Sequence, residues 1–215
     1  MKNIYYIAIE GVIGVGKTSL AKILSEELSA KIVLERFEEN PFLEDFYVDP
    51  ERYAFQTQMF FLLSRYRQQM EFKQFDLFSK LVVSDYMFQK DKLFASINLN
   101  EREFELYNSV YKLLERDVLK PDLVIFLQAS VDRLMHNIRK RGRSYERYIQ
   151  REYIESLVHV YNEFFFFYKD SPLLIINTEE MDFVNNKDDL NDILKVVKEP
   201  FEGVKYYNPT RRLLK

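Results

Sequence analysis

Cysteine is absent from this chain of 215 residues, and histidine occurs only twice, at His136 and His159. Without cysteine the protein has no disulfides, no thiol catalysis and no cysteine-based zinc site, and it fits the reducing conditions of the cytoplasm. Two histidines argue against a histidine-rich metal site and against a Ser-His-Asp triad. We therefore expect a cytoplasmic protein whose chemistry relies on other side chains.

Excess charge and long apolar runs are also missing. The formal net charge of −3 gives no general attraction to nucleic acid or to a membrane surface, so we expect neither as a partner. The four phenylalanines at 164–167 are far too few to span a bilayer, and we expect them in a buried helical segment. Near the start of the chain, Glu10 and a glycine-rich loop follow an apolar run too soon for a signal peptide.

Repeats, low-complexity tracts and Pro/Gly-rich linkers are absent as well, which argues against several domains. The chain is 47% apolar, enough to bury one full core. We therefore predict a single domain over residues 1–215, into which at most a short lid is inserted.

Glycine is scarce, but its distribution is informative. Only five glycines occur, and three of them lie in the stretch 11–18, G-V-I-G-V-G-K-T. This stretch fits G-x-x-x-x-G-K-[ST], the pattern of a phosphate-binding P-loop. A β-rich apolar run over Ile4–Ile9 precedes it, and a helix-spaced segment over Ser19–Leu28 follows it. The motif thus has its strand–loop–helix setting, and it predicts binding of a nucleoside triphosphate.

Each part of the P-loop has a physical role in holding phosphate. Glycines let the backbone approach a phosphate without a Cβ clash, and successive N–H groups at the positive end of the helix face the anion. Lys17 adds a point charge between phosphates, and Thr18 offers a hydroxyl to Mg²⁺. The predicted cofactor-binding residues here are Gly11, Val12, Ile13, Gly14, Val15, Gly16, Lys17 and Thr18.

The remaining pattern predicts an α/β fold. Apolar runs at 30–34, 81–83, 123–127 and 173–177 indicate four further buried strands. Helical segments are expected at 50–75, 101–119, from 131 onward, 148–168 and 188–197. Strands alternate with helices and no hairpin signal occurs, so we predict an open parallel sheet of five strands with right-handed crossovers. The tail at 200–215 gives no clear signal.

Two acidic residues follow predicted strands, at the edge where α/β proteins bind ligands. Glu35 ends the second strand, where it could accept a proton from a hydroxyl nucleophile or simply be a solvated residue of an acidic loop. Its position supports the two interpretations about equally. Asp85 ends the third strand and is placed like the acid that steers Mg²⁺ or a reacting hydroxyl in P-loop enzymes. An additional role of Asp85 as a helix cap is compatible with this.

The helix predicted at 50–75 carries polar residues among apolar ones. Gln58 and Arg65 are seven positions apart and therefore point the same way. A buried glutamine and arginine on one face could read the edge of a nucleobase through paired hydrogen bonds. The alternative is a helix face half exposed to water, and the spacing alone favours that alternative.

The most basic stretch of the chain, R-K-R-G-R-S-Y-E-R, covers residues 139–147. We interpret it as a lid, at about 137–147, whose arginines close over a triphosphate and neutralise charge during transfer. Gly142, between two arginines, suits a mobile turn. A solvated helix face and a nucleic-acid patch are the alternatives, and the overall acidity argues against the second.

Several of these stretches together resemble the deoxyribonucleoside kinase family, over a region from Ile4 to about Lys198. The P-loop and Glu35 both have their counterparts there. The other matching stretches are Y-V-D-P-E-R-Y at 47–53 (with Tyr53 for the family's tryptophan), F-Q-T-Q at 55–58, L-S-R-Y-R at 63–67 and the lid R-G-R-S-Y-E at 141–146. The resemblance implies a P-loop kinase fold with a short Arg-rich lid.

The resemblance also implies an activity, namely transfer of phosphate from ATP, with Mg²⁺, to the 5′-hydroxyl of a deoxyribonucleoside for nucleotide salvage. It implies that Glu35 lies nearest that hydroxyl, with Asp85 supporting it and Mg²⁺. These two carboxylates compete for the role of proton acceptor, and we favour Glu35. Gln58 would pair with the base. The other implied positions are Arg65 and Asp91 at the base edge, Tyr47 and Glu146 at the sugar 3′-hydroxyl, Arg141 and Arg143 over the phosphates, and Asp182 and Phe183 (with Met181) at the adenine of ATP.

One motif departs from the family pattern. After the third strand the family has Asp/Glu-Arg-Ser, whereas this chain has Asp85-Tyr86-Met87. The arginine near the 5′-oxygen is missing, and Lys90 is the nearby residue that could supply a charge. The Asp-Tyr variant is similar to a bacterial subgroup that acts on deoxyguanosine, so we expect a purine substrate, with deoxyguanosine favoured over deoxyadenosine. The family also implies a homodimer, or a heterodimer with a related kinase.

Two other functions share part of this pattern. A nucleoside monophosphate kinase of the thymidylate-kinase type also has a P-loop and an Arg-rich lid, but it needs cationic groups for the phosphate of its acceptor. A non-enzymatic P-loop switch would bind a nucleotide and a protein partner. The face bearing Gln58 and Arg65 and the match to a sugar site disfavour the switch.

Overall fold

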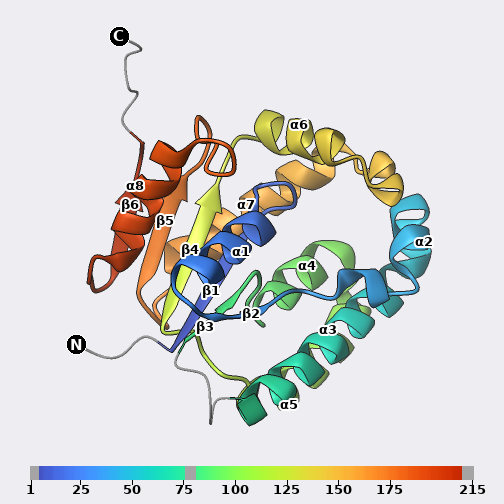
Figure 1. Cartoon of the computed structure of the whole chain (residues 1–215). Coiled ribbons are helices and arrows are strands. Elements are labelled where there is room, and N and C mark those ends of the chain that lie inside the picture. The colour runs from blue at the N-terminus through green and yellow to red at the C-terminus, as the bar shows by residue number, and fades with distance from the viewer. Residues whose placement is uncertain (1–4, 76–80, 210–215) are drawn as a thin grey trace.

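In the computed structural model, which describes residues 5–75 and 81–209, six strands form one sheet in the order β2-β3-β1-β4-β5-β6 (Figure 1). Every neighbouring pair is parallel. The side chains of residues 72–75 are not described. The strands are β1 (Tyr6–Gly11), β2 (Lys31–Val33), β3 (Val82–Ser84), β4 (Leu123–Gln128), β5 (Leu173–Asn177) and β6 (Val204–Tyr207).

The helices lie close to where the sequence predicts them, and the long one begins at Pro50, whose missing N–H is tolerated in a first turn. The helices are α1 (Lys17–Glu27), α2 (Leu43–Val48), α3 (Pro50–Phe75), α4 (Lys90–Asn98), α5 (Glu101–Leu114), α6 (Val131–Arg141), α7 (Arg151–Phe167) and α8 (Lys187–Lys198). Two helices, α2 and α4, lie where the sequence analysis predicts none.

The α/β fold with a parallel sheet is confirmed, but the expected number of five strands is wrong. The additional strand, β6, lies in the tail that gave no signal, and it pairs with β5 so that Val204 is opposite Leu173. Its side chains alternate between exposed and half-buried. An edge strand of this kind gains its backbone hydrogen bonds from one neighbour and needs no apolar run. Residues 210–215 of the tail lie outside the described residues.

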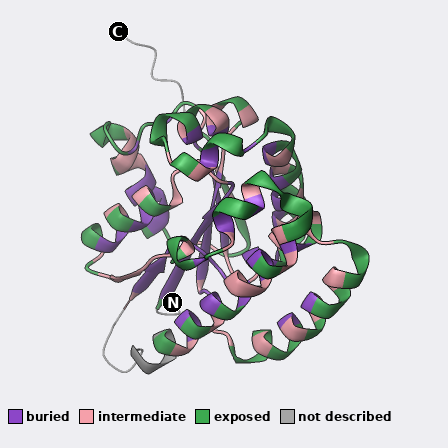
Figure 2. Ribbon diagram, turned by 90° about the vertical axis from the view of Figure 1, so that its right-hand side faces the viewer, coloured by how far each residue is buried: buried purple, intermediate pink, exposed green. Residues whose placement is uncertain are grey.

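The core lies on and around the central strands (Figure 2). Every residue of β1 and all but the last of β4 are buried, as expected for parallel strands covered on both faces. Phe126 of β4 packs on Phe165 of α7, with ring centroids 4.2 Å apart. Because β1 and β3 are neighbours in the sheet, their carboxyl ends lie next to one another. The P-loop follows β1.

A second apolar cluster joins α3, α4 and α5, which lie on the side of the molecule away from β5, β6 and α8 (Figure 1). Leu62 of α3, Ala95 of α4 and Tyr107 of α5 are fully buried in it. A capping box at Asn100 and Glu103 fixes the start of α5. This cluster holds α3, with its polar residues, at a fixed place beside the sheet.

The four phenylalanines at the end of α7 are not all buried as expected. Phe165 is 2% exposed, whereas Phe166 and Phe167 are 76% and 67% exposed. Consecutive residues of a helix point in directions about 100° apart, so four in a row cannot all face one core. Over the described ranges, each helix is too short or too polar to serve as a transmembrane span.

Candidate active site

The P-loop turns tightly between β1 and α1, and its glycines are required by backbone geometry. Gly16 has a φ of +104°, and a Cβ there would lie 2.9 Å from the ring of Phe183. Lys17 donates from Nζ to the carbonyl oxygens of Gly11 and Val12, at 2.8 and 3.2 Å. The ammonium group is thus folded over the loop, where a phosphate would meet it.

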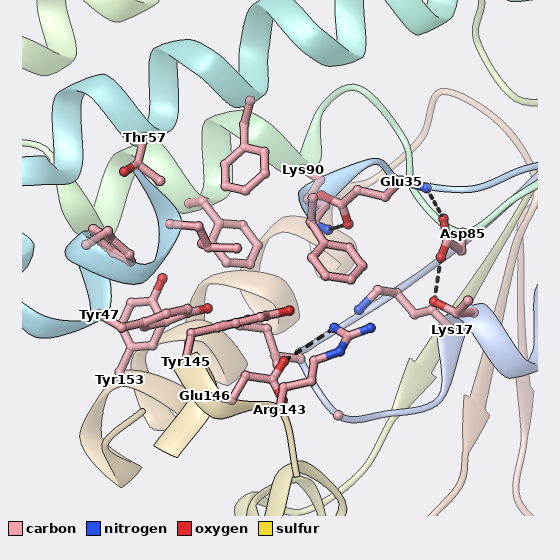
Figure 3. A pocket seen from close by; sticks show the side chains of 18 of the residues that line it. Lys17, Glu35, Tyr47, Thr57, Asp85, Lys90, Arg143, Tyr145, Glu146 and Tyr153 are labelled. Carbon is pink, nitrogen blue, oxygen red and sulfur yellow. Dashed lines mark hydrogen bonds and ion pairs between the residues drawn. The ribbon is translucent and has the colours of Figure 1, made fainter. Parts of the chain in front are cut away.

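Asp85 connects the P-loop with the end of β2 (Figure 3). Its Oδ2 accepts the hydroxyl of Thr18 at 2.5 Å, and its Oδ1 accepts the backbone N–H of Glu35 at 2.8 Å. A hydroxyl and a carboxylate side by side are hard oxygen donors of the kind that Mg²⁺ prefers. Across the described part of the chain no group of three or more acidic or histidine residues could hold a metal. These two oxygen donors therefore fit a Mg²⁺ ion whose other ligands are phosphate and water.

Glu35 is held between two cations. Its Oε1 pairs with Arg65, and its Oε2 accepts from Nζ of Lys90 at 2.5 Å. Burial raises the pKa of Glu35, but the charges and hydrogen bonds of Arg65 and Lys90 outweigh burial and hold that pKa well below its usual range. Glu35 is therefore ionised at neutral pH and offers a fixed anionic acceptor at this point of the site.

Arg65 is itself buried and anchored on both sides. Besides Glu35 it pairs with Asp91 of α4, which lies beneath it and does not line the cavity described below. The guanidinium also lies over Phe61, 4.8 Å from the ring centroid, and 5.9 Å from the ring of Tyr86. Tyr86, at the position where the resemblance led us to expect an arginine, is fully buried. Its ring lies near the guanidinium of Arg65 and adds no charge.

The segment interpreted as a lid, at about 137–147, contains the last turn of α6 and the residues after it, and α6 ends at Gly142, which has a φ of +69°. Two arginines of the lid converge on one carboxylate: Arg141 donates to Glu146 from Nε at 3.0 Å and from Nη2 at 2.5 Å, and Arg143 from Nη1 at 3.4 Å. Arg143 also lies 4.1 Å over the ring of Phe37. Both lid arginines are thus held by Glu146, which is 5% exposed. They face the P-loop side of the site.

The other end of the site is a slot with aromatic walls. Tyr47 of α2 stacks on Tyr145 of the lid, with ring centroids 6.2 Å apart and planes at 10°. Burial raises the pKa of Tyr47 well above its usual value, so its hydroxyl stays protonated and can donate. Gln58 of α3, 2% exposed, lies at the same cavity. The slot thus offers flat aromatic surfaces together with a buried amide, which are groups that can bind a flat ligand with polar edges.

One cavity brings together most of the residues that the sequence singles out, from the P-loop to α3. Arg65 and Lys90 lie between its two ends. Its lining includes Ile13, Gly14, Lys17, Thr18, Glu35, Tyr47, Gln58, Arg65, Asp85, Arg141, Arg143 and Glu146.

Other predicted residues lie outside the lining of this cavity. Val12 and Val15 are buried in the core under the loop. Phe183 is 5% exposed, with its ring against Gly16. Asp182 is exposed, and its carboxylate holds the turn at Asn185. Placement of adenine against Asp182 and Phe183 stays a prediction.

Sequence reasoning missed the aromatic lining and one buried carboxylate. The aromatic walls carry no local motif, because they come from six separate segments: they are Phe37, Phe46, Tyr47, Phe61, Phe94, Tyr145 and Tyr153. Glu10, 1% exposed, accepts from the N–H groups of Gly11 at 3.2 Å and Met87 at 2.7 Å and from the hydroxyl of Tyr161 at 3.2 Å. A charged residue at the end of an otherwise apolar buried strand was the available signal.

Comparison with known proteins agrees with this geometry. The model of the deoxynucleoside kinase family matches residues 7–202, so the chain belongs to that family. It is therefore a kinase rather than a nucleotide-binding switch, and its fold is the P-loop kinase fold.

Among its relatives, a deoxyguanosine kinase of Bacillus subtilis is 37% identical over 206 residues, which cover 93% of this chain and 99% of the relative. A deoxyadenosine kinase of Lactobacillus acidophilus is 32% identical, over 94% and 98% of the two chains. The solved structure of deoxyadenosine kinase from M. mycoides with bound dATP has a TM-score of 0.79 at 28% identity, and the match covers 91% of this chain and all of that one.

Proposed function

We propose that this kinase transfers the γ-phosphate of ATP to the 5′-hydroxyl of a purine deoxyribonucleoside, with deoxyguanosine favoured over deoxyadenosine, in nucleotide salvage. One observation carries the proposal. The phosphate loop and the aromatic slot open into one cavity, and a chain of contacts from Thr18 through Asp85 to Glu35 connects them. A nucleoside in the slot therefore has its hydroxyl directed at the phosphate loop.

Glu35 receives the acceptor hydroxyl in this proposal. As an anion that is only partly exposed, it accepts the O–H hydrogen bond, which orients the oxygen for in-line attack on the γ-phosphorus. Its low pKa makes it a weak base in the ground state, so the proton passes to it as the oxygen–phosphorus bond forms and the hydroxyl becomes acidic. Asp85 holds the hydroxyl of Thr18 at the P-loop, where it would bind Mg²⁺, which favours Glu35 over Asp85 for this role.

The cationic groups stabilise the phosphates. Lys17 and the loop amides hold them, and Thr18 with Asp85 would hold Mg²⁺, which when bound neutralises charge on the β- and γ-phosphate oxygens. Arg141 and Arg143 turn from Glu146 toward the phosphates about Gly142. Glu146 is then available to the sugar 3′-hydroxyl, together with Tyr47.

The base preference rests on the relatives and on the polar edge of the slot. The names of the two relatives described above specify deoxyguanosine and deoxyadenosine. Gln58 can donate and accept at once, and Arg65, held over Asp91, donates. This set suits a purine edge that carries both acceptors and donors.

The test is a panel of acceptors with ATP and Mg²⁺: the four deoxynucleosides, and deoxyguanosine and thymidine 5′-monophosphates. We expect the highest kcat/KM with deoxyguanosine, then deoxyadenosine, and loss of turnover on addition of EDTA. Turnover of monophosphates alone would replace the proposal with a monophosphate kinase. A pyrimidine preference would overturn only the choice of base.

We further propose a cytoplasmic dimer, formed with a second copy or with a related kinase, on the basis of the family resemblance. Light scattering of the purified protein measures its mass directly, and a monomer at all concentrations would exclude the homodimer.

A further inference from the structure

We propose that Lys90 is a second phosphate-binding lysine of this active site, placed across the cavity from Lys17 so that the phosphoryl group passes between two ammonium groups. The inference rests on the proposed function. Lys90 is the first residue of α4 and is 6% exposed. A lysine is almost never buried to this degree without a specific partner or role.

Holding Glu35 does not by itself account for Lys90. The other oxygen of Glu35 is already paired with Arg65, which is buried and anchored by Asp91. Glu35 thus pairs with two cations, of which Arg65, held by Asp91 as well, is the rigid one. The side chain of Lys90 is a flexible four-carbon stem with a compact charge, and such a group can exchange one anion for another.

Lys90 and Lys17 lie close enough to repel each other. Both line the same cavity, Lys17 from the P-loop and Lys90 from the start of α4 (Figure 3). Burial and, second, the positive charge of Lys90 lower the pKa of Lys17 to about 8. The carboxylates of Glu10, Glu35 and Asp85 offset part of this repulsion. A phosphoryl group between the two ammonium groups adds an anion at the place where their charges meet.

Glu10 fixes the separation of the two lysines. One oxygen of its carboxylate accepts the N–H of Gly11, at the start of the P-loop, and the other accepts the N–H of Met87, in the turn that leads to Lys90. The loop of Lys17 and the turn of Lys90 are therefore tied to the same buried group. The two lysine side chains thus face the cavity from backbone segments that are both held by Glu10.

In the transfer step, the bond from the 5′-oxygen to the γ-phosphorus forms while the bond from that phosphorus to the β–γ bridging oxygen breaks. The hydroxyl proton goes to Glu35, whose hold on Lys90 weakens as the carboxylate loses its charge. Lys90 stays protonated throughout and donates to the oxygens of the phosphoryl group. After transfer, this group is the 5′-phosphate of the product.

The test compares Lys90→Met with Lys90→Arg, and uses Lys92→Met, an exposed lysine of the same helix, as the control. Calorimetry measures binding of deoxyguanosine and of its 5′-monophosphate to the full chain. For Lys90→Met we expect nucleoside affinity within about threefold of the unchanged protein, monophosphate affinity lower by about tenfold or more, and kcat lower by about 100-fold. Lys90→Arg should recover part of both losses, and Lys92→Met should change neither.

Equal losses for nucleoside and monophosphate would mean that Lys90 only positions Glu35, and would overturn the inference. Unchanged monophosphate affinity would overturn it too. If thermal unfolding shows that Lys90→Met is not folded, Lys90→Gln takes its place in the same comparison. Failure of the unchanged protein to phosphorylate any deoxynucleoside is a different result, because it removes the proposed function itself.

Discussion

The two ends of the active-site cavity are built in different ways. At the phosphate end, contiguous residues 11–18 supply backbone groups, a lysine and a hydroxyl, and the end of β1 fixes them. At the nucleoside end, side chains from the separate segments α2, α3, α4 and the lid converge. Glu35 and the two cations that pair with it lie between the ends. A local motif is enough to specify the first end. The second exists only once the chain is folded, so its substrate preference can change without affecting phosphate binding.

The largest effect should come from Glu35, because it lies at the junction of the two ends. Glu35→Gln keeps the shape but removes the anion that receives the hydroxyl, so we expect kcat to fall about 100-fold or more while ATP binding is kept. Steady-state kinetics and ATP calorimetry measure the two quantities. Glu38→Gln, in the same loop and exposed, is the control. An unchanged kcat would assign the proton acceptor to Asp85.

Gln58 tests the nucleoside end alone. Gln58→Leu has a similar volume but removes the hydrogen bonds to the base, so KM for deoxyguanosine should rise about 10-fold, which is the cost of one unmade buried hydrogen bond. KM for ATP should not change. Gln56→Leu, on the exposed face of the same helix, should leave both values as they are. If the Gln58 variant weakened ATP as much as nucleoside, the two ends would not be independent.

The same difference explains how far the sequence predicts this molecule. The P-loop, the central strands and the α3 helix are recognisable because each is a contiguous pattern with a fixed period. The short edge strand β6 has no such pattern, because it becomes a strand only by pairing with β5. Nor does the sequence reveal the partners of Glu10, because Met87 and Tyr161 are 77 and 151 positions away.

Among the site residues, those on regular elements were easier to predict than their partners. Glu35 and Asp85 were singled out because they follow strands, and Gln58 with Arg65 because they share a helix face. It was the resemblance to the deoxyribonucleoside kinases, and not the spacing, that favoured a site role for Glu35, Gln58 and Arg65. That Arg65 and Lys90 both pair with Glu35 could not be predicted, since it depends on how α3 and α4 pack on the sheet. The burial of Phe183 against Gly16 likewise could not be predicted, because it depends on how the turn that contains Phe183 packs on the P-loop.

The pH dependence of binding should differ between the two ends. The pKa of Lys17 in the free protein is about 8, and a bound phosphate raises it. Above about pH 8, ATP binding must therefore take up a proton, and its Kd should rise by up to about tenfold per pH unit. Deoxyadenosine, whose base does not ionise in this range, should bind equally well throughout. Calorimetry between about pH 7 and pH 9.5 in buffers of different ionisation enthalpy measures affinity and proton uptake together.

A variant with a cation that does not titrate checks the cause. Lys17→Arg should bind ATP with a Kd that no longer rises over this range, whatever its absolute affinity, because arginine stays protonated. A rise that persists in Lys17→Arg would place the titrating group elsewhere, and a parallel rise for deoxyadenosine would contradict the independence of the two ends.

The smallest effect concerns the lid that connects the ends. Gly142→Ala places a side chain at a φ of +69°, where the nearest atom, the carbonyl oxygen of Arg139, is 3.9 Å from the new Cβ. The space is adequate, so the cost is backbone strain of about 1 kcal/mol. The free energy of unfolding should fall by that amount, and the proposed turning of the lid arginines about this residue predicts that kcat falls a few-fold.

Gly203→Ala separates these two consequences. Gly203 has nearly the same backbone conformation, a φ of +71°, and no atom lies within 4 Å of its Cβ position. It precedes β6, far along the chain from the lid, so its substitution should lower the free energy of unfolding by a similar amount and leave kcat unchanged. Equal losses of kcat in both variants would show that lower stability, and not the hinge of the lid, limits turnover. A loss confined to Gly142→Ala would show that the motion of the lid couples the phosphate end to the nucleoside end.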